Sequence, residues 1–266
     1  MLQRIACGIL LVVGLMAAFA GQIAPAPYAR QFREAPNALP SRQHWLGTDE
    51  VGRDRFSRVL YGTRVSLLLA PAAAFVSTFL AAVIGGLAGY LGGLWARIAM
   101  SCVDLFLSLP WLFLLIMVRG LLPLDVSPTV SALVTFLLLG LLGWASSARI
   151  LCASTANLRE SGFLLQARAT GLSGLRLFVV HVLPNLRPIL LAQFWISIPV
   201  FVLAEANLGI LGLGVAEPMP SWGGLLRELE GMLSLGETPW KLVPLVLLVV
   251  VVSCFELATS KQEYAV

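Results

Sequence analysis

Six apolar runs, each close to the length needed to cross a membrane, dominate this chain. A helix needs about 20 apolar residues to span the hydrocarbon core of a bilayer. Because lipid offers the backbone no hydrogen bonds, runs of this length predict helices. The runs are Ile5–Ile23, Val65–Leu91, Ile98–Val118, Val130–Ile150, Ile189–Leu208 and Leu242–Leu257. The sequence therefore predicts an all-α integral membrane protein with six transmembrane helices.

The composition excludes a soluble domain and a nucleic-acid-binding surface. Only 12% of the 266 residues are charged and 58% are hydrophobic, whereas soluble domains carry about 25% charged residues. The net charge is +4, but the basic residues lie mostly between the apolar runs and form no Lys/Arg-rich block. We therefore expect the lipid bilayer as surroundings and no nucleic acid as partner.

The N-terminus and the cysteines each allow a simple interpretation. Arg4 followed by an apolar stretch to Ala20 resembles a signal peptide, yet an uncleaved first span is favoured because the rest of the chain is membrane-embedded. Four cysteines lie in or beside apolar runs without a C-x-x-C pair. They read as small buried hydrophobes, not as a disulfide framework or a zinc site.

Pro110 lies inside the third run and Pro199 inside the fifth, and the second run ends in glycines. Pro110 and Pro199 each remove a helix hydrogen bond, which predicts a kink. Gly89 and Gly93 have the G-x-x-x-G spacing that permits close helix packing. A flexible helix end explains these glycines equally well.

Asp104 and Glu205 are the charged residues that fall in the middle of the runs. Intramembrane acids are costly, so each is a functional-site hypothesis by default. We expect Asp104 near a helix start, at the membrane interface. For Glu205, an interfacial or helix-packing role is favoured over a role in substrate or proton binding.

The connecting segments define the expected domain organisation. Residues 1–64 form the first span and an external loop, and residues 65–258 form the transmembrane domain. Within that domain, residues 151–188 make a polar cytoplasmic segment, and residues 259–266 form a cytoplasmic tail. Counting Lys and Arg on the two sides does not fix the orientation.

Motifs for catalysis are absent from the sequence. The only lysines, Lys241 and Lys261, do not follow a glycine, so there is no phosphate-cradling loop for ATP. Nucleophile-elbow and zinc-protease motifs are missing, and two histidines are too few for a histidine-rich metal site. We expect no catalytic residue, no metal and no cofactor. Any energy from ATP must come from a partner chain.

Three segments carry a specific resemblance. The first is L-G-T-D-E-V-G-R-D at residues 46–54, the second is A-R-A-T-G-L-S at residues 167–173 with H-V-L-P-N at residues 181–185, and the third is P-M-P-S-W-G-G at residues 218–224. In this order they resemble permeases of ABC importers of the dipeptide/oligopeptide/nickel branch, specifically the second permease of the pair. The likeness covers residues 44–226.

The resemblance implies a fold of six transmembrane helices like that of ABC type I importer permeases. It also implies a multi-pass protein of the bacterial inner membrane with both termini in the cytoplasm. It implies three kinds of partner: a homologous permease, two ATP-binding cassette subunits below, and an extracytoplasmic substrate-binding protein above. Peptides are the default substrate of such systems, although nickel and other solutes use the same scaffold.

The second segment resembles the family's ATPase-coupling motif. Ala167, Gly171, Leu183 and Pro184 fall in register, but Leu165 stands where the family has glutamate and Gln166 where it has alanine. With Arg168 these residues are the predicted ATPase-coupling site. From the residues alone, a short helix ending at a glycine stop either docks in a partner groove or lies on the membrane surface; the resemblance favours docking.

The first and third segments are then expected outside the cell, as a folded cap that also touches the receptor. The expected residues are Gly47, Thr48, Asp49, Gly52, Arg53, Asp54, Pro220, Ser221, Trp222 and Gly223. Asp49, Arg53, Asp54 and Arg58 can pair among themselves. Trp222 with its glycines is expected in a re-entrant or interfacial element, since tryptophan prefers that depth.

The predicted function is that of a permease subunit that forms a translocation pathway by alternating access, driven by ATP hydrolysis in its partners. The alternatives are an ATP-independent secondary transporter or channel, which would use intramembrane charges such as Asp104 and Glu205, and a degenerate structural paralogue.

Overall fold

The computed structural model describes residues 1–123, 126–169, 171, 174–229 and 238–259. The described part is helical and contains no strand, only two isolated β-bridges near the start of the chain. This confirms the predicted all-α class. Nearly all of the predicted cytoplasmic tail, residues 260–266, lies outside the described residues.

The N-terminal half contains four helical units. The short helices α1 (Leu2–Ala18) and α2 (Ala20–Ile23) come first. A long rod then consists of α3 (Arg55–Ala81), the π-helical turn η1 (Ala82–Gly86) and α4 (Leu87–Leu91). It is followed by α5 (Gly93–Ser108) with α6 (Trp111–Leu121), and by α7 (Pro128–Leu142) with α8 (Ala145–Arg159).

The C-terminal half begins with short elements and ends with two long helices. The short ones are α9 (Gly162–Ala169), α10 (Gly174–Leu177), the π-helical turn η2 (Phe178–Val182) and α11 (Leu183–Asn185). The others are α12 (Arg187–Ile210), α13 (Trp222–Arg227), the 3₁₀ turn η3 (Pro239–Leu242) and α14 (Val243–Thr259).

The described helices fit a protein that crosses the membrane several times. Four stretches are long and apolar enough to span it: Arg55–Leu91, Pro128–Arg159, Arg187–Ile210 and Pro239–Thr259. A fifth span results if the bent pair α5 and α6 counts as one, and α1 is a shorter apolar helix. The multi-pass fold is confirmed, and the number six stays a prediction compatible with these helices.

Two sequence-predicted boundaries change for clear physical reasons. The second span begins at Arg55, ten residues before Val65, because the Asp54 side chain caps the helix by accepting from the Ser57 N–H. The third run breaks at Leu109 and Pro110, where α5 and α6 meet at 84°. Proline at that point produces a bend, as its missing donor predicts.

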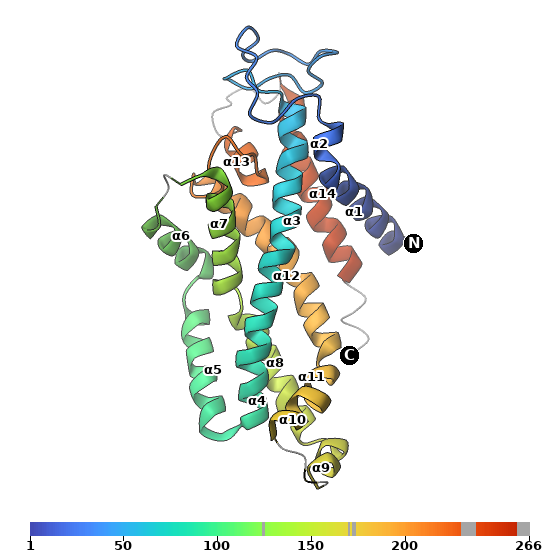
Figure 1. Ribbon diagram of the computed structural model, residues 1–266, viewed down its shortest axis with the longest axis vertical. Coiled ribbons are helices and arrows are strands. Elements are labelled where there is room, and N and C mark those ends of the chain that lie inside the picture. Colours follow the sequence, from blue (N-terminus) through green and yellow to red (C-terminus); the bar gives the residue numbers. More distant parts are fainter. Residues whose placement is uncertain (124–125, 170, 172–173, 230–237, 260–266) are drawn as a thin grey trace.

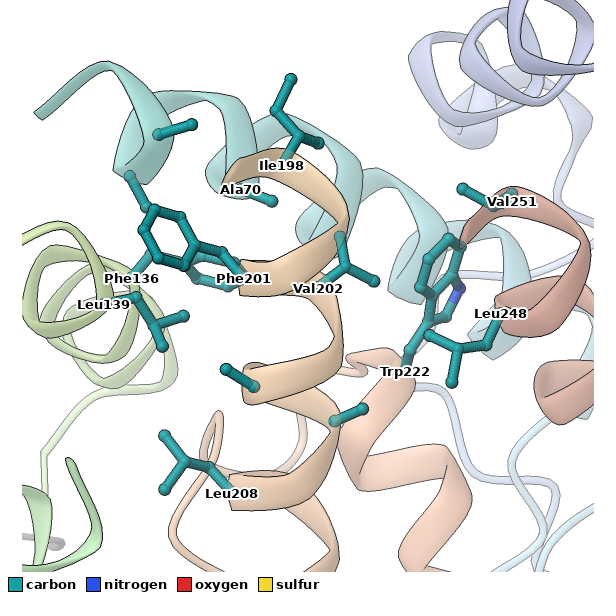
Figure 2. Packing of buried hydrophobic residues seen from close by; sticks show 14 of the residues in the cluster. Ala70, Phe136, Leu139, Ile198, Phe201, Val202, Leu208, Trp222, Leu248 and Val251 are labelled. Atoms are coloured by element: carbon teal, nitrogen blue, oxygen red, sulfur yellow. The ribbon is translucent and has the colours of Figure 1, made fainter. Parts of the chain in front are cut away.

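The hydrophobic core lies where α3, α7, α12, α13 and α14 meet (Figure 1). Figure 2 shows Phe136 and Leu139 of α7 beside Phe201 of α12, while Trp222 of α13 fills the space between Val202 and the α14 residues Leu248 and Val251. Packing of large side chains therefore joins α7 to α12, and α12 to α13 and α14.

Glycines bring η1 and α4 into backbone contact with α8. A Cβ at Gly85 would overlap the Ala148 carbonyl oxygen, and one at Gly89 would overlap that of Cys152. The close-packing pair is thus Gly85 with Gly89. The expected partner of Gly89, Gly93, has nothing within 4 Å and is the first residue of α5.

The two ends of the molecule carry different segments. Figure 1 shows the irregular loop between α2 and α3 at one end of the bundle, and α9 at the opposite end. This separation agrees with the expectation that the first and second resemblance segments lie on opposite sides of the membrane.

The glycine contact yields a stability prediction. Gly85→Ala and Gly89→Ala should each destabilise the chain by about 1–3 kcal/mol, because the added methyl overpacks against a fixed backbone. Thermal unfolding of the purified protein in detergent measures this. Gly120→Ala in α6 is the matched control, since nothing lies within 4 Å there, and alanine favours a helix. A Gly85→Ala protein that melts at or above the wild-type temperature contradicts the prediction.

Candidate functional site

The cap (residues 24–54) is shaped by tight turns. Gly47 and Gly52 have φ angles of +69° and +80°, where only glycine is unstrained, and a Cβ at either position would overlap a carbonyl oxygen. The buried Thr48 hydroxyl donates to the Ala35 carbonyl (2.5 Å) and accepts from the Ala38 N–H (2.8 Å). These predicted cap residues therefore hold the loop in its fold.

The pairing expected within the first segment is present in part. The Asp49 carboxylate accepts from the Arg53 backbone N–H at 2.7 Å and from Arg53 Nε at 2.6 Å. Arg58 Nε lies 3.7 Å from Asp49 Oδ2. Asp54 stays outside this pairing: it caps α3 through Ser57 and lies 2.9 Å from His44 Nδ1.

Two glutamates that the sequence reasoning missed complete an ion cluster, here called the cap cluster. It consists of Asp49, Arg53, Arg55, Arg58, Glu217 and Glu228. Arg58, whose side chain is 1% exposed, donates at 3.0 Å to both Glu217 and Glu228, and Arg55 donates to Glu228 at 2.7 Å. No spacing in the sequence indicated these partners, since they lie about 160 and 170 residues beyond Arg58.

The cap cluster shifts the pKa values of two of its members, Glu217 and Arg53, toward the charged form. Burial alone would raise the pKa of Glu217, but the hydrogen bond and positive charge of Arg58, together with Arg53, lower it below its ordinary value of 4.5. Burial would lower the pKa of Arg53, but Asp49 and Glu217 raise it. A polar hollow of about 370 Å³ adjoins the cluster and is lined in part by Glu50, Arg227 and Lys241.

The third segment is buried, so its role is internal. Pro220, Ser221, Trp222 and Gly223 are all buried. Ser221 caps α13 by accepting from the Gly224 N–H, and the Trp222 indole donates to Thr63 Oγ1 at 3.0 Å. Trp222 was expected at interface depth, but it is a core residue with 0% exposure because its polar N–H finds a partner inside the bundle. These four residues are therefore buried within this chain, where Ser221 caps α13 and Trp222 bonds to α3.

Two buried charged residues lie at the centre of the bundle. Glu205 of α12, 0% exposed, accepts from Ser66 of α3 at 3.3 Å and from the Gly223 N–H at 3.4 Å. It is thus a helix-packing residue, the role favoured from sequence. Arg119 of α6, 1% exposed, donates to Ser131 of α7 at 3.1 Å. Sequence reasoning missed Arg119 because it follows directly after an apolar run.

The predicted coupling segment forms α9 at the far end of the molecule from the cap (Figure 1). Leu164 is fully buried and packs with Tyr90, Leu177 and Phe178, so it offers no surface to a partner. Its neighbour Leu165 is 53% exposed, and Gln166 is also exposed. Ala167 is partly buried against the same cluster, and Arg168 is exposed and lies over the Tyr90 ring at 5.6 Å.

The residues after α9 divide into a stop signal and a separate turn. Gly171 has a φ of +79° and its N–H donates to the Arg168 carbonyl, which is the glycine helix stop predicted from sequence. Leu183 and Pro184 begin α11 instead, and Leu183 lines an apolar hollow with Phe75 and Phe79 of α3. Leu183 therefore lies apart from the coupling residues of α9, in a hollow that no α9 residue lines.

Asp104 lies inside a helix. Asp104 was expected near a helix start, but helix α5 begins at Gly93, eleven residues earlier. Its carboxylate pairs with the guanidinium of Arg149 of α8, and the side chains are 62% and 52% exposed. The acid is therefore paired with a basic residue near the end of the fourth apolar run.

The cap cluster yields a second prediction. Arg58→Gln should destabilise the protein by about 3 kcal/mol, because it leaves a buried set of charges unbalanced. Glu217→Gln should cost less, about 1 kcal/mol, because that side chain is half exposed. Thermal unfolding in detergent measures both, with the exposed cap residue changed in Arg42→Gln as control.

The same cluster sets a pH dependence. The pKa of Glu217 is lowered in the folded state, so its contribution to stability is present above its ordinary pKa and lost as the pH falls through the lowered value. The difference in melting temperature between wild type and Glu217→Gln should therefore shrink on acidification. A difference that grows at low pH contradicts this assignment.

Comparisons with known proteins identify the family to which this chain belongs. The family described as "Binding-protein-dependent transport system inner membrane component" matches residues 81–258. The dipeptide transport system permease protein DppC of Bacillus subtilis is 32% identical over 220 residues, covering 83% of this chain and 67% of that protein. The oligopeptide transport system permease protein OppC of Mycobacterium bovis is 37% identical over 225 residues, covering 83% and 75%. The chain therefore belongs to the family of inner-membrane components of binding-protein-dependent transport systems.

Proposed function

We propose that this chain is the second of two homologous permeases in an ATP-driven peptide importer, and that the two together form the pathway by alternating access. As a family member the chain is a multi-pass inner-membrane transport component and not an enzyme. Peptides are proposed as substrate because the relatives named above are dipeptide and oligopeptide permeases. The observation that carries the proposal is the family match over residues 81–258, which includes both α9 and α13.

The arrangement of the ends supports a division of labour between partners. The cap, locked to α13 by the cap cluster, is the proposed face toward an extracytoplasmic binding protein. At the other end α9 is the proposed contact for one of two ATP-binding cassette subunits. Leu164 packs the inner side of α9 into the hydrophobic cluster around Tyr90, while Phe163, Leu165 and Gln166 remain exposed. An exposed apolar helix face of this kind suits insertion into a partner's groove.

The two alternative functions have less support. A secondary transporter needs an intramembrane acid that is free to bind an ion or proton. Glu205 instead joins α12 to α3 and α13, and Asp104 is paired with Arg149. A degenerate structural paralogue is motivated by Leu165 at the position of the family's glutamate. Transport by the complete system separates all three.

The decisive experiment measures uptake. Proteoliposomes that contain this chain, its second permease, the two ATPases and the binding protein should accumulate labelled dipeptide only with ATP. Omitting this chain alone should abolish uptake. Accumulation that does not need ATP supports the secondary transporter, and a complete system without any peptide uptake supports the paralogue.

A prediction for α9 follows from its glycine stop. Gly171→Val should strain the helix end by about 1–2 kcal/mol, because a β-branched residue is disfavoured at positive φ. Less ATPase should then co-purify, or ATP should be hydrolysed with less peptide moved. Gly162→Val is the matched control, since both positions are uncrowded and only Gly171 has a positive φ.

A cysteine at position 165 should form a crosslink with an ATPase subunit in the assembled complex. If Gly171→Val transports and co-purifies like wild type, and residue 165 crosslinks only to lipid or to this chain, α9 is a helix on the membrane surface and the coupling assignment is wrong.

A further inference from the structure

Helix α5 carries a polar stripe on its exposed surface. Arg97, Ser101, Asp104 and Ser108 are all exposed, and they follow one another at intervals of four, three and four residues. Residues at this spacing lie on one face of an α-helix. The rest of the exposed surface of α5 is largely apolar, with Trp95, Ile98 and Leu105 more than half exposed. One side of this helix is thus suited to water and another to lipid.

Helix α8 carries a matching polar stripe beside it. Ser146, Arg149 and Asn157 are exposed and share a face with the small residue Ala153. The two helices are in contact, and the ion pair between Asp104 and Arg149 joins the two stripes. Together they make one continuous surface, here called the α5–α8 polar face.

The centre of this face lies at membrane depth. Trp95 and Arg97 mark the level of the membrane interface near the start of α5, because exposed tryptophan and arginine favour that level. Asp104 lies nine residues beyond Trp95, which is about 14 Å along a helix at 1.5 Å per residue. Arg149 lies ten residues from Arg159, whose guanidinium lies against Gly92 at the start of α5. Both charges are therefore about halfway across a hydrocarbon core of about 30 Å.

Lipid cannot cover such a surface at low cost. A charged side chain at the centre of a bilayer faces the bundle interior or a water-filled cavity in almost all membrane proteins. The Asp104 and Arg149 side chains are 62% and 52% exposed, so the interior of this chain does not enclose them. We therefore expect the α5–α8 polar face to border water in the working transporter.

An apolar hollow adjoins this face at the bend between α5 and α6. Its volume is about 200 Å³, and its lining includes Phe106, Trp111, Phe201 and, at the edge of the polar face, Ser146. One positive charge, one negative charge and an aromatic hollow thus lie close together. This combination complements a short peptide, whose termini carry opposite charges and whose side chains are often apolar.

We propose that the Asp104–Arg149 pair is a peptide contact site in the wall of the translocation pathway. Asp104 receives the peptide's ammonium group, Arg149 receives its carboxylate, and the hollow takes an apolar side chain. An exposed ion pair contributes only about 0–1 kcal/mol, so exchanging it for a substrate's charges costs little. The proposal rests on the function proposed above and adds a defined site to it.

The first test asks whether the polar face meets water. In the complete transporter, with the other native cysteines replaced by alanine, Ser101→Cys and Ser146→Cys should react with a membrane-impermeant thiosulfonate about tenfold faster than native Cys102, because only a hydrated thiol ionises readily. Cys102 is exposed at the same depth but about 100° around the helix from Ser101. Equal reaction at Ser101→Cys and Cys102, both with and without ATP, overturns the proposal.

The second test asks whether peptide occupies the pair. Excess unlabelled dipeptide with the binding protein should slow the labelling of Ser101→Cys, and Asp104→Asn or Arg149→Gln should remove this protection and lower dipeptide uptake. Ser108→Ala on the same stripe is the control and should keep both. A purely structural ion pair gives no protection by peptide, and that result overturns the proposal even where the wild-type complex transports peptide. Absence of uptake by the wild-type complex would instead refute the proposed function.

Discussion

Small residues allow the central rod to contact the helices around it, and the rest of the fold depends on that close approach. In lipid there is little hydrophobic force between helices, so association relies on shape and on backbone proximity. The rod of α3, η1 and α4 buries Ala70, Ala73 and Ala74 in the core and then brings Gly85 and Gly89 against the backbone of α8. The large side chains that meet at Trp222 fill the space that this framework leaves.

Charged residues join the parts that small residues cannot. Arg58 reaches from the start of α3 to Glu217 and Glu228, so the cap and α13 form one unit. Deeper in the bundle Glu205 bonds to Ser66 and to the backbone at Gly223. Each of these groups bonds to residues that are far apart from it in the sequence and so connects distant segments.

Local features could be predicted from the sequence, and long-range ones could not. The length of the apolar runs indicated helices, Pro110 indicated the bend, and Gly171 indicated a helix end, because each signal acts within a few residues. The partners of Arg58, the burial of Trp222 and the inward direction of Leu164 depend on which distant helix lies opposite. The exposed Asp104 was found as an intramembrane acid, but its partner Arg149 was not, because it lies 45 residues further along the chain and nothing local shows which helix packs beside α5.

Helix α8 gives the described geometry a mechanical consequence. It carries Arg149 one turn from its start and leads into α9 across only Glu160 and Ser161. Its backbone lies against Gly85 at Ala148 and against Gly89 at Cys152, so the stretch that carries Arg149 is held close to the rod. The remaining arm of α8, from Cys152 to Arg159, is about 11 Å long at 1.5 Å per residue. Helix α9 and the Arg149 guanidinium are thus joined by one short helix, and the contact at Cys152 lies between them.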